Sequence, residues 1–281
     1  FFVNGIKLAV ECQGTEGPLI ILLHGFPDTA ASMSVLGTRL VQNGYRCAAP
    51  HLRGYSKTGP APDGRYDLEA VALDLILLIE AMGASQAIVV GHDWGAAIGC
   101  VAAAMAPEKV QYLFALSVPP MGTFLKQGLG SLRQLWQSRY MVYFQLPFLP
   151  ERKLMKNGAA EVGRIWDRWA SAGYPAEHVE QAKANLGRLE NAKNALAYYR
   201  QILKLHRPEV RRSWRLSFKA HGVPTLVFVG ADDRCISPKV FKGTTQKVLV
   251  IPDAGHFLPS EAPHAIADAI IDALATQDDS A

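Results

Sequence analysis

The residue best suited to chemistry in this sequence is Asp93, in the segment Gly91-His92-Asp93-Trp94-Gly95. The segment directly follows an apolar run, 87–90, and precedes a stretch that opens with the small residues Ala96, Ala97 and Gly99. Glycines on both sides permit a tight turn from a strand into a helix, which raises the central side chain above the sheet. The alternative, an Asp that only caps the helix, does not explain these glycines. We therefore predict that the Asp93 carboxylate is a nucleophile.

A carboxylate nucleophile selects a kind of substrate. A serine at such a turn attacks the carbonyl carbon of an ester, whereas a carboxylate suits displacement at an sp³ carbon and leaves an alkyl ester on the protein. Activated water can then attack the carbonyl of that ester in a second step. Asp93 therefore predicts a substrate with an epoxide ring or a carbon–halogen bond.

Candidate partners for Asp93 follow two later strand-like runs. Gly230-Ala231-Asp232-Asp233 ends the run 226–229, and Gly255-His256-Phe257 follows the run 248–251. We predict His256 as the general base for water and Asp233 as the acid that orients its ring, with Asp232 as the alternative. The other common location for this acid follows the run 112–116 and holds Ser117, Val118 and Pro119, which have no carboxyl group.

The segment His24-Gly25-Phe26-Pro27 follows the first apolar run, 19–23. Its glycine allows close approach of the backbone, and Pro27 fixes the turn and permits a cis peptide bond. We expect the backbone N–H groups of Phe26 and Trp94 to form an oxyanion hole, which would stabilise the tetrahedral intermediate when water attacks the Asp93 ester.

Short apolar runs alternate with helical patterns, which predicts an α/β fold: a mostly parallel sheet flanked by helices. An opening hairpin around Asn4-Gly5 is expected to add antiparallel edge strands, and a helix is expected from the N-cap Asp67 to Gly83. The alternation stops over residues 119–221, where helical signals and aromatic residues predominate. We predict a core of residues 1–118 and 222–281 with an inserted helical cap, 119–221, over the carboxyl ends of the strands.

Together these motifs resemble the epoxide hydrolases of the α/β-hydrolase superfamily, along nearly the whole chain and in the order nucleophile, acid, histidine. The predicted cap is the most discriminating part. Residues 140–147, Tyr-Met-Val-Tyr-Phe-Gln-Leu-Pro, and 196–200, Leu-Ala-Tyr-Tyr-Arg, are similar to two tyrosine motifs of that family. The resemblance implies that Tyr140 and Tyr199 hydrogen-bond the epoxide oxygen and supply a proton as the ring opens. Tyr143 and Tyr198 are the alternatives nearest to them in sequence.

Two other functions share parts of this pattern. A haloalkane dehalogenase would also use Asp93 and His256, and Trp94 could donate its indole N–H to a halide, but that family's pattern has an asparagine at the position of Phe26. A fluoroacetate-type dehalogenase would place an arginine beside the nucleophile, where this chain has Trp94, Ala96 and Ala97. A non-catalytic ligand-binding relative would not need the triad, the oxyanion turn and the tyrosine pair together.

The composition of the chain limits the classes of molecule that it is expected to bind. Lys and Arg number 29 against 25 Asp and Glu, a net charge of +4, and no nucleic-acid-binding signature accompanies them. The four cysteines form no metal-binding pattern and no apolar run reaches membrane-spanning length. We expect a cytoplasmic monomer or homodimer with no metal and no cofactor, which acts on a small apolar epoxide and water. The side chains expected to contact the substrate are Phe26, Trp94, Trp136, Phe144 and Phe257.

Overall fold

A computed structural model describes residues 1–171 and 173–278 and contains a seven-stranded sheet in the order β3-β5-β4-β6-β7-β8-β9. Neighbouring strands are parallel, except that β3 is antiparallel to β5 at one edge. The strands are β3 (Val10–Gln13), β4 (Leu19–Leu23), β5 (Arg46–Pro50), β6 (Ala87–His92), β7 (Val110–Leu116), β8 (Thr225–Gly230) and β9 (Lys247–Ile251). Every strand predicted from an apolar run is present. The inner strands are mostly buried on both faces, which is why they are largely apolar.

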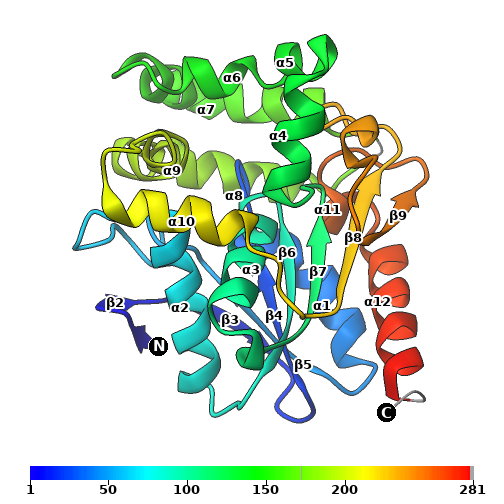
Figure 1. The fold of residues 1–281 in the computed structure, drawn as a ribbon. Coiled ribbons are helices and arrows are strands. Elements are labelled where there is room, and N and C mark those ends of the chain that lie inside the picture. The colour runs from blue at the N-terminus through cyan, green and yellow to red at the C-terminus, as the bar shows by residue number, and fades with distance from the viewer. Residues whose placement is uncertain (172, 279–281) are drawn as a thin grey trace.

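Helices cover both faces of the sheet (Figure 1). On one face, α2 (Leu68–Ala81), α3 (Trp94–Met105) and α10 (Pro208–Phe218) pack against one another. On the other face, α1 (Ser34–Val41) packs against α12 (Pro263–Asp278). As predicted, the Asp67 side chain caps α2 by accepting the Ala70 N–H, and Gly83 follows its end with a φ of +71°.

The chain between β7 and β8 is helical, and most of it lies over the carboxyl ends of the strands, at the top of Figure 1. We call α4 to α9 the cap helices: α4 (Met121–Leu129), α5 (Leu132–Gln137), α6 (Arg139–Tyr143), α7 (Leu149–Trp169), α8 (Ala176–Leu186) and α9 (Leu189–Gln201). Helix α7 consists of two helices joined at a break over 156–159, where Asn157, Gly158 and Ala159 have positive φ. The next helix, α10, packs on α2 and α3 instead.

The opening hairpin is present, but its predicted place in the sheet is wrong. Strands β1 (Phe2–Val3) and β2 (Ile6–Lys7) pair only with each other in a separate two-stranded sheet. The antiparallel edge strand is β3 instead, which pairs with β5 from Val10–Pro50 to Gln13–Cys47. Glu11 and Cys12 are exposed on this strand, so no continuous apolar run marked it in the sequence.

A buried ion pair connects the core to the cap helices. The Arg53 guanidinium, with no exposed side-chain surface, donates to both carboxylate oxygens of Asp74, at 2.6 and 2.5 Å. The backbone carbonyl of Arg53 accepts the hydroxyl of Tyr198 from α9, at 2.9 Å. This contact fixes the rotation of α9 above the sheet. In the part of the chain that the structure describes, no helix is both long and apolar enough to cross a bilayer.

Candidate active site

Asp93 lies at the turn from β6 into α3, in a conformation that non-glycine residues rarely adopt. Its φ is +53° and its ψ is −116°. Its carbonyl accepts the N–H groups of Ala96 and Ala97 in the first turn of α3, and its own N–H donates to Leu116. A Cβ at Gly95 would collide with the Leu23 carbonyl, so only glycine allows α3 to approach β4 this closely. This strained turn holds the buried carboxylate against the Phe26 N–H and His256.

The structure brings His256 and Asp233 to this carboxylate. His256 Nε2 lies 3.5 Å from Asp93 Oδ2, and His256 Nδ1 lies 2.9 Å from Asp233 Oδ2. The other oxygen of Asp233 accepts the N–H groups of Cys235 and Ile236, at 2.7 and 2.9 Å. These bonds fix the position of the Asp233 carboxylate, which accepts the Nδ1 proton of the imidazole and so keeps Nε2 directed at Asp93. Asp232 instead accepts a hydrogen bond from the hydroxyl of Ser171.

Electrostatics couple these groups strongly. Burial alone would lower the pKa of His256, but the negative charges of Asp233 and Asp93 outweigh it and raise this pKa to about 10. Burial alone would raise the pKa of Asp93, but its close contact with the His256 imidazolium holds this pKa below 3.8. At neutral pH the site therefore contains an ionised carboxylate against an imidazolium.

The turn that contains Phe26 also contacts Asp93. The backbone N–H of Phe26 donates to Asp93 Oδ1 at 2.8 Å, and the Phe26–Pro27 peptide is cis. A Cβ at Gly25 would collide with the side chain of Asp93, so glycine is needed for this approach. Trp94, whose N–H is the second predicted donor, is the first residue of α3. One carboxylate oxygen of Asp93 therefore already has the donor that would stabilise negative charge on it.

Two tyrosines from different cap helices meet near Asp93. The rings of Tyr140, from α6, and Tyr199, from α9, lie 5.9 Å apart, and the Tyr199 ring lies 5.3 Å from that of Phe26. The Tyr199 hydroxyl is buried and has no hydrogen-bond partner among the described residues; the Tyr140 hydroxyl lies 3.7 Å from Cys235 Sγ. Burial first, and then the Asp93 charge, raise the pKa of Tyr199 well above 10, so its proton is present at neutral pH.

The two neighbouring tyrosines occupy other places. The Tyr198 hydroxyl bonds to the Arg53 carbonyl, away from Asp93. The Tyr143 ring lies under the Lys153 ammonium, 5.4 Å from it. The structure therefore distinguishes Tyr140 and Tyr199 from these alternatives on geometry alone.

Three further polar residues support the triad, and the sequence interpretation gave them no role. The carbonyl of His256 accepts the ring N–H of His92 at 2.8 Å and the hydroxyl of Ser117 at 2.7 Å. Asp28 Oδ2 lies 3.9 Å from the other ring nitrogen of His92, and burial raises the pKa of Asp28 to about 7. Burial also lowers the pKa of His92, to about 4, so its ring is neutral. His92 and Ser117 thus fix the backbone at His256.

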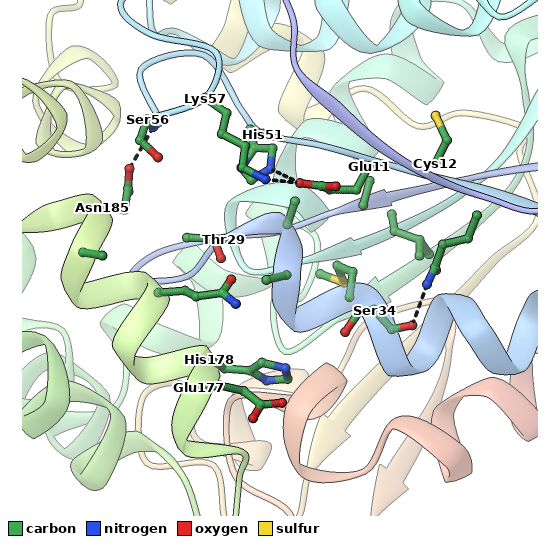
Figure 2. A pocket seen from close by; sticks show the side chains of 18 of the residues that line it. Glu11, Cys12, Thr29, Ser34, His51, Ser56, Lys57, Glu177, His178 and Asn185 are labelled. Atoms are coloured by element: carbon green, nitrogen blue, oxygen red, sulfur yellow. Dashed lines mark hydrogen bonds and ion pairs between the residues drawn. The ribbon is translucent and has the colours of Figure 1, made fainter.

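A cavity of about 800 Å³ lies between α8 and the β3 edge, and Asp93, Asp233 and His256 do not line it. It includes His51, whose Nε2 lies 3.0 Å from Glu11 Oε1 (Figure 2). A second cavity of about 680 Å³ lies among α5, α6 and α7 and includes Tyr140 and Trp169. We call this second space the cap cavity. Among residues 1–171 and 173–278, no three His, Cys, Asp or Glu side chains are grouped so that they could hold a metal ion.

The five predicted substrate contacts are placed differently from one another. Phe144 lines the cap cavity, and Trp136 does so at its outer edge, where 68% of its surface is exposed. The rings of Phe26 and Trp94 both contact Tyr199, next to the triad. Phe257 is fully buried and stacked on Trp166 with ring centroids 3.8 Å apart, and its ring lies 5.5 Å from that of His256.

Comparisons with known proteins show the family to which the chain belongs. The chain matches the alpha/beta hydrolase fold family over residues 18–263, and it belongs to this family. It is 31% identical to the AB hydrolase superfamily protein YfhM of Bacillus subtilis, over 98% of this chain and 96% of that protein. It is 28% identical to Epoxide hydrolase A of Mycobacterium tuberculosis, over 96% of this chain and 95% of that protein.

Solved structures give the same result. The epoxide hydrolase VrEH1 from Vigna radiata superimposes with a TM-score of 0.81 and 27% identity, over 98% of this chain and 96% of that one. The resemblance to the α/β-hydrolase-fold epoxide hydrolases that the sequence motifs indicated is therefore confirmed, and the protein is a hydrolase of this fold.

Proposed function

We propose that the protein hydrolyses epoxides to vicinal diols through a covalent ester on Asp93. The observation that carries this proposal is the convergence of two protonated phenols, Tyr140 and Tyr199, on the side of the site that faces the Asp93 carboxylate. The leaving group of an opening epoxide is an alkoxide that stays attached to the substrate. Donors fixed at that oxygen stabilise the charge that develops there.

In the first half of the reaction, an oxygen of Asp93 attacks a carbon of the ring and the C–O bond to that carbon breaks. The oxygen that is released takes a proton from one tyrosine and a hydrogen bond from the other. The product is a hydroxyalkyl ester of Asp93. Because burial keeps both tyrosines protonated, a proton is available at neutral pH.

In the second half, His256 takes a proton from water and the hydroxide adds to the Asp93 ester carbonyl. The oxyanion that forms accepts hydrogen bonds from the N–H groups of Phe26 and Trp94. Its collapse breaks the ester bond, and the leaving alkoxide takes the second proton of the attacking water to give the diol. Asp93 is then again a carboxylate beside a protonated His256. One epoxide and one water are consumed for each diol.

The charges of the site give the order of these steps. Before attack, the Asp93 carboxylate is one of the two charges that raise the pKa of His256 to about 10, so the imidazole is protonated and cannot act as a base. Esterification neutralises Asp93, which lies 3.5 Å from His256 Nε2. The pKa of His256 then falls, and its proton passes through solvent to the tyrosinate left by ring opening. The imidazole therefore becomes a base only after the ester has formed.

One observation favours a second candidate, a haloalkane dehalogenase. The indole N–H of Trp94 is buried without a hydrogen-bond partner among the described residues, as a halide donor would be before the halide is present. Against it, the Phe26 side chain offers no second donor, and the neighbouring space is occupied by the Tyr199 ring, 4.9 Å from that of Trp94.

A panel of terminal epoxides and matched alkyl bromides separates the candidates when diol and bromide are both measured. We expect diol from the epoxides and little bromide from the halides, with both products absent in Asp93→Ala. Bromide release without diol formation would identify a dehalogenase. Binding of the panel compounds without either product would indicate a non-catalytic binding protein.

A further inference from the structure

Exposed apolar side chains are concentrated on α4, α5, α6 and the first half of α7. Of the fifteen large apolar side chains that are exposed among the described residues, eight lie within residues 121–156. With exposed fractions of 44 to 86%, they are Leu129, Leu132, Leu135, Trp136, Val142, Leu146, Phe148 and Leu149. These helices lie at the top of Figure 1, away from both termini. We call the exposed side chains of residues 121–156 the outer cap surface.

The apolar side chains of this surface lie close together in the fold. Leu129, Leu135 and Val142 line one small cavity of about 410 Å³ among α4, α6 and α9. Val142 and Trp136 also line the cap cavity. Apolar side chains that are exposed as a group, rather than singly, mark a surface that binds another molecule or a membrane.

The charges of the same segment are almost all positive. Six of its side chains are exposed cations: Lys126, Arg133, Arg139, Arg152, Lys153 and Lys156. Its carboxylate, Glu151, is buried and paired with Arg200 of α9 at 2.6 Å, so it does not neutralise the surface. The rest of the chain has 23 Lys and Arg against 24 Asp and Glu. The net positive charge of the protein is therefore concentrated on the outer cap surface.

Most of these cations have no partner that compensates their charge. Four of them have neither a side-chain hydrogen bond nor an ion pair with any described residue: Lys126, Arg133, Arg152 and Lys156. Lys153 is paired with Glu161 at 3.1 Å. Arg139 lies over the Trp136 ring, 4.0 Å from its centroid, so a guanidinium and an indole are exposed together. The outer cap surface can therefore bind an extended anionic partner.

Charge decides which partner covers this surface. In a twofold pair of identical chains the same patch meets itself, which here would place six cations against six others. An anionic bilayer surface complements them instead. Leu, Phe and Trp side chains interspersed with Lys and Arg are the composition of helices that lie in a membrane interface. The apolar groups enter the acyl region, the cations approach the lipid phosphates, and Trp lies at the level of the headgroups.

We propose that the outer cap surface docks on the face of a bilayer that contains anionic phospholipid, without spanning it. Leu132 and Phe148 enter the leaflet, and Arg133 and Arg152 bind the phosphate groups. Docking also places two cavities against the leaflet, because the exposed Val142 lines both of them. A molecule dissolved in the leaflet then lies next to the cavities that are lined by Tyr140 and by Tyr199.

The test is sedimentation of the whole protein with sucrose-loaded vesicles. One set contains phosphatidylcholine and phosphatidylglycerol in a ratio of about 7:3, and the other contains phosphatidylcholine alone. Each Lys or Arg near an anionic surface raises partitioning about fivefold, so we expect the anionic vesicles to be preferred by at least about tenfold. The preference should shrink in 0.5 M NaCl, because salt screens the surface charges.

A double variant, Phe148→Ser with Arg152→Gln, tests the surface itself. Neither residue lines the cap cavity or the smaller cavity. Partitioning into anionic vesicles should fall about tenfold or more, about fivefold of it from the lost charge and the rest from the lost aromatic ring. Diol formation from a water-soluble epoxide should be unchanged, so this test does not depend on the proposed function.

Phe2→Ser with Lys7→Gln is the matched control. These two residues pair across the hairpin of β1 and β2, and the double variant also removes one exposed aromatic ring and one exposed cation. The hairpin lies away from the cap helices in Figure 1. Partitioning of this variant should equal that of wild type.

Several results would overturn the proposal. They are no sedimentation of wild type with the anionic vesicles, equal partitioning into both kinds of vesicle, and equal losses in the two double variants. A wild-type dimer in sedimentation velocity that the Phe148 and Arg152 double variant dissociates, without vesicle binding, would identify a surface for self-association instead. Binding of polyglutamate without binding of anionic vesicles would identify a surface for an acidic protein.

Discussion

Two adjacent tyrosines on α9 are expected to respond in opposite ways to loss of one hydroxyl. Tyr199 and Tyr198 are both buried, with 3% and 1% of their surface exposed, so Phe preserves the packing of either ring. The Tyr198 hydroxyl bonds to the Arg53 carbonyl, whereas the Tyr199 hydroxyl has no partner among the described residues. The hydrogen bond of Tyr198 stabilises the folded protein. The second hydroxyl is buried at an energetic cost, and we assign its use to the reaction.

The expected magnitudes follow from these contacts. A buried hydroxyl without a partner costs about 1–3 kcal/mol, so Tyr199→Phe should raise the free energy of unfolding by about 1 kcal/mol and Tm by roughly 2–4 °C. Tyr198→Phe leaves a buried carbonyl unpaired and should lower stability by about 1–2 kcal/mol. Removal of a preorganised donor typically costs about 10²–10³-fold in rate, so only Tyr199→Phe should slow alkylation by that factor.

The assay is single-turnover alkylation by an epoxide, together with calorimetric unfolding of both variants. Tyr140→Phe should slow alkylation similarly, and the double variant with Tyr199→Phe should be nearly inactive, although the two effects need not add. An alkyl bromide that alkylates Asp93 without a proton is the control, and its rate should change little. The reasoning is refuted if Tyr199→Phe is destabilised and keeps wild-type epoxide kinetics, or if Tyr198→Phe loses alkylation instead.

Three further predictions follow from the site and the core. His256→Gln should accumulate the Asp93 ester, seen as one added substrate mass per chain by intact-protein mass spectrometry, and Asp233→Asn should slow ester hydrolysis less. Normal turnover by His256→Gln, or the absence of alkylation in it, would contradict the role of His256. The pKa of His256 in the folded protein, about 10, exceeds its ordinary value of 6.5, so its contribution to stability is complete below about pH 6.5 and is lost as the pH rises toward 10. The unfolding midpoint of wild type should therefore fall over this range relative to that of His256→Gln. Parallel curves of midpoint against pH for the two proteins would refute the raised pKa. Arg53→Met leaves the buried Asp74 carboxylate without its ion-pair partner and should lower the free energy of unfolding by about 3–5 kcal/mol. Arg39→Met, which breaks an exposed pair with Asp268, should lower it by under about 1 kcal/mol. Urea titrations measure both changes.

The sheet and the triad could be predicted because their signals are local. Parallel strands that are buried on both faces have sequences of short apolar runs. Asp93 and His256 each follow such a run, in a turn that contains glycine. The acid was predicted as Asp233 with Asp232 open, since both follow the same strand. Only the fold shows that the Asp233 side chain turns toward His256 while Asp232 turns toward Ser171.

The parts that sequence did not predict depend on contacts between distant segments. Ser117 supports the carbonyl of His256 across 139 residues of chain, and sequence reasoning considered its position only as a place for a carboxylate. The stacking of Phe257 on Trp166 likewise joins the turn after β9 to α7, a contact that no local sequence pattern indicated.

The most direct test of the Asp93 ester is a single turnover in ¹⁸O-labelled water with enzyme in excess over epoxide. An oxygen of Asp93 becomes an oxygen of the first diol, and solvent oxygen enters the carboxylate when the ester is hydrolysed. We therefore predict an unlabelled first diol and ¹⁸O in the peptide that contains Asp93, measured by mass spectrometry. A first diol labelled from solvent, with an unlabelled Asp93 peptide, would show that water attacks the epoxide directly and would contradict the covalent mechanism.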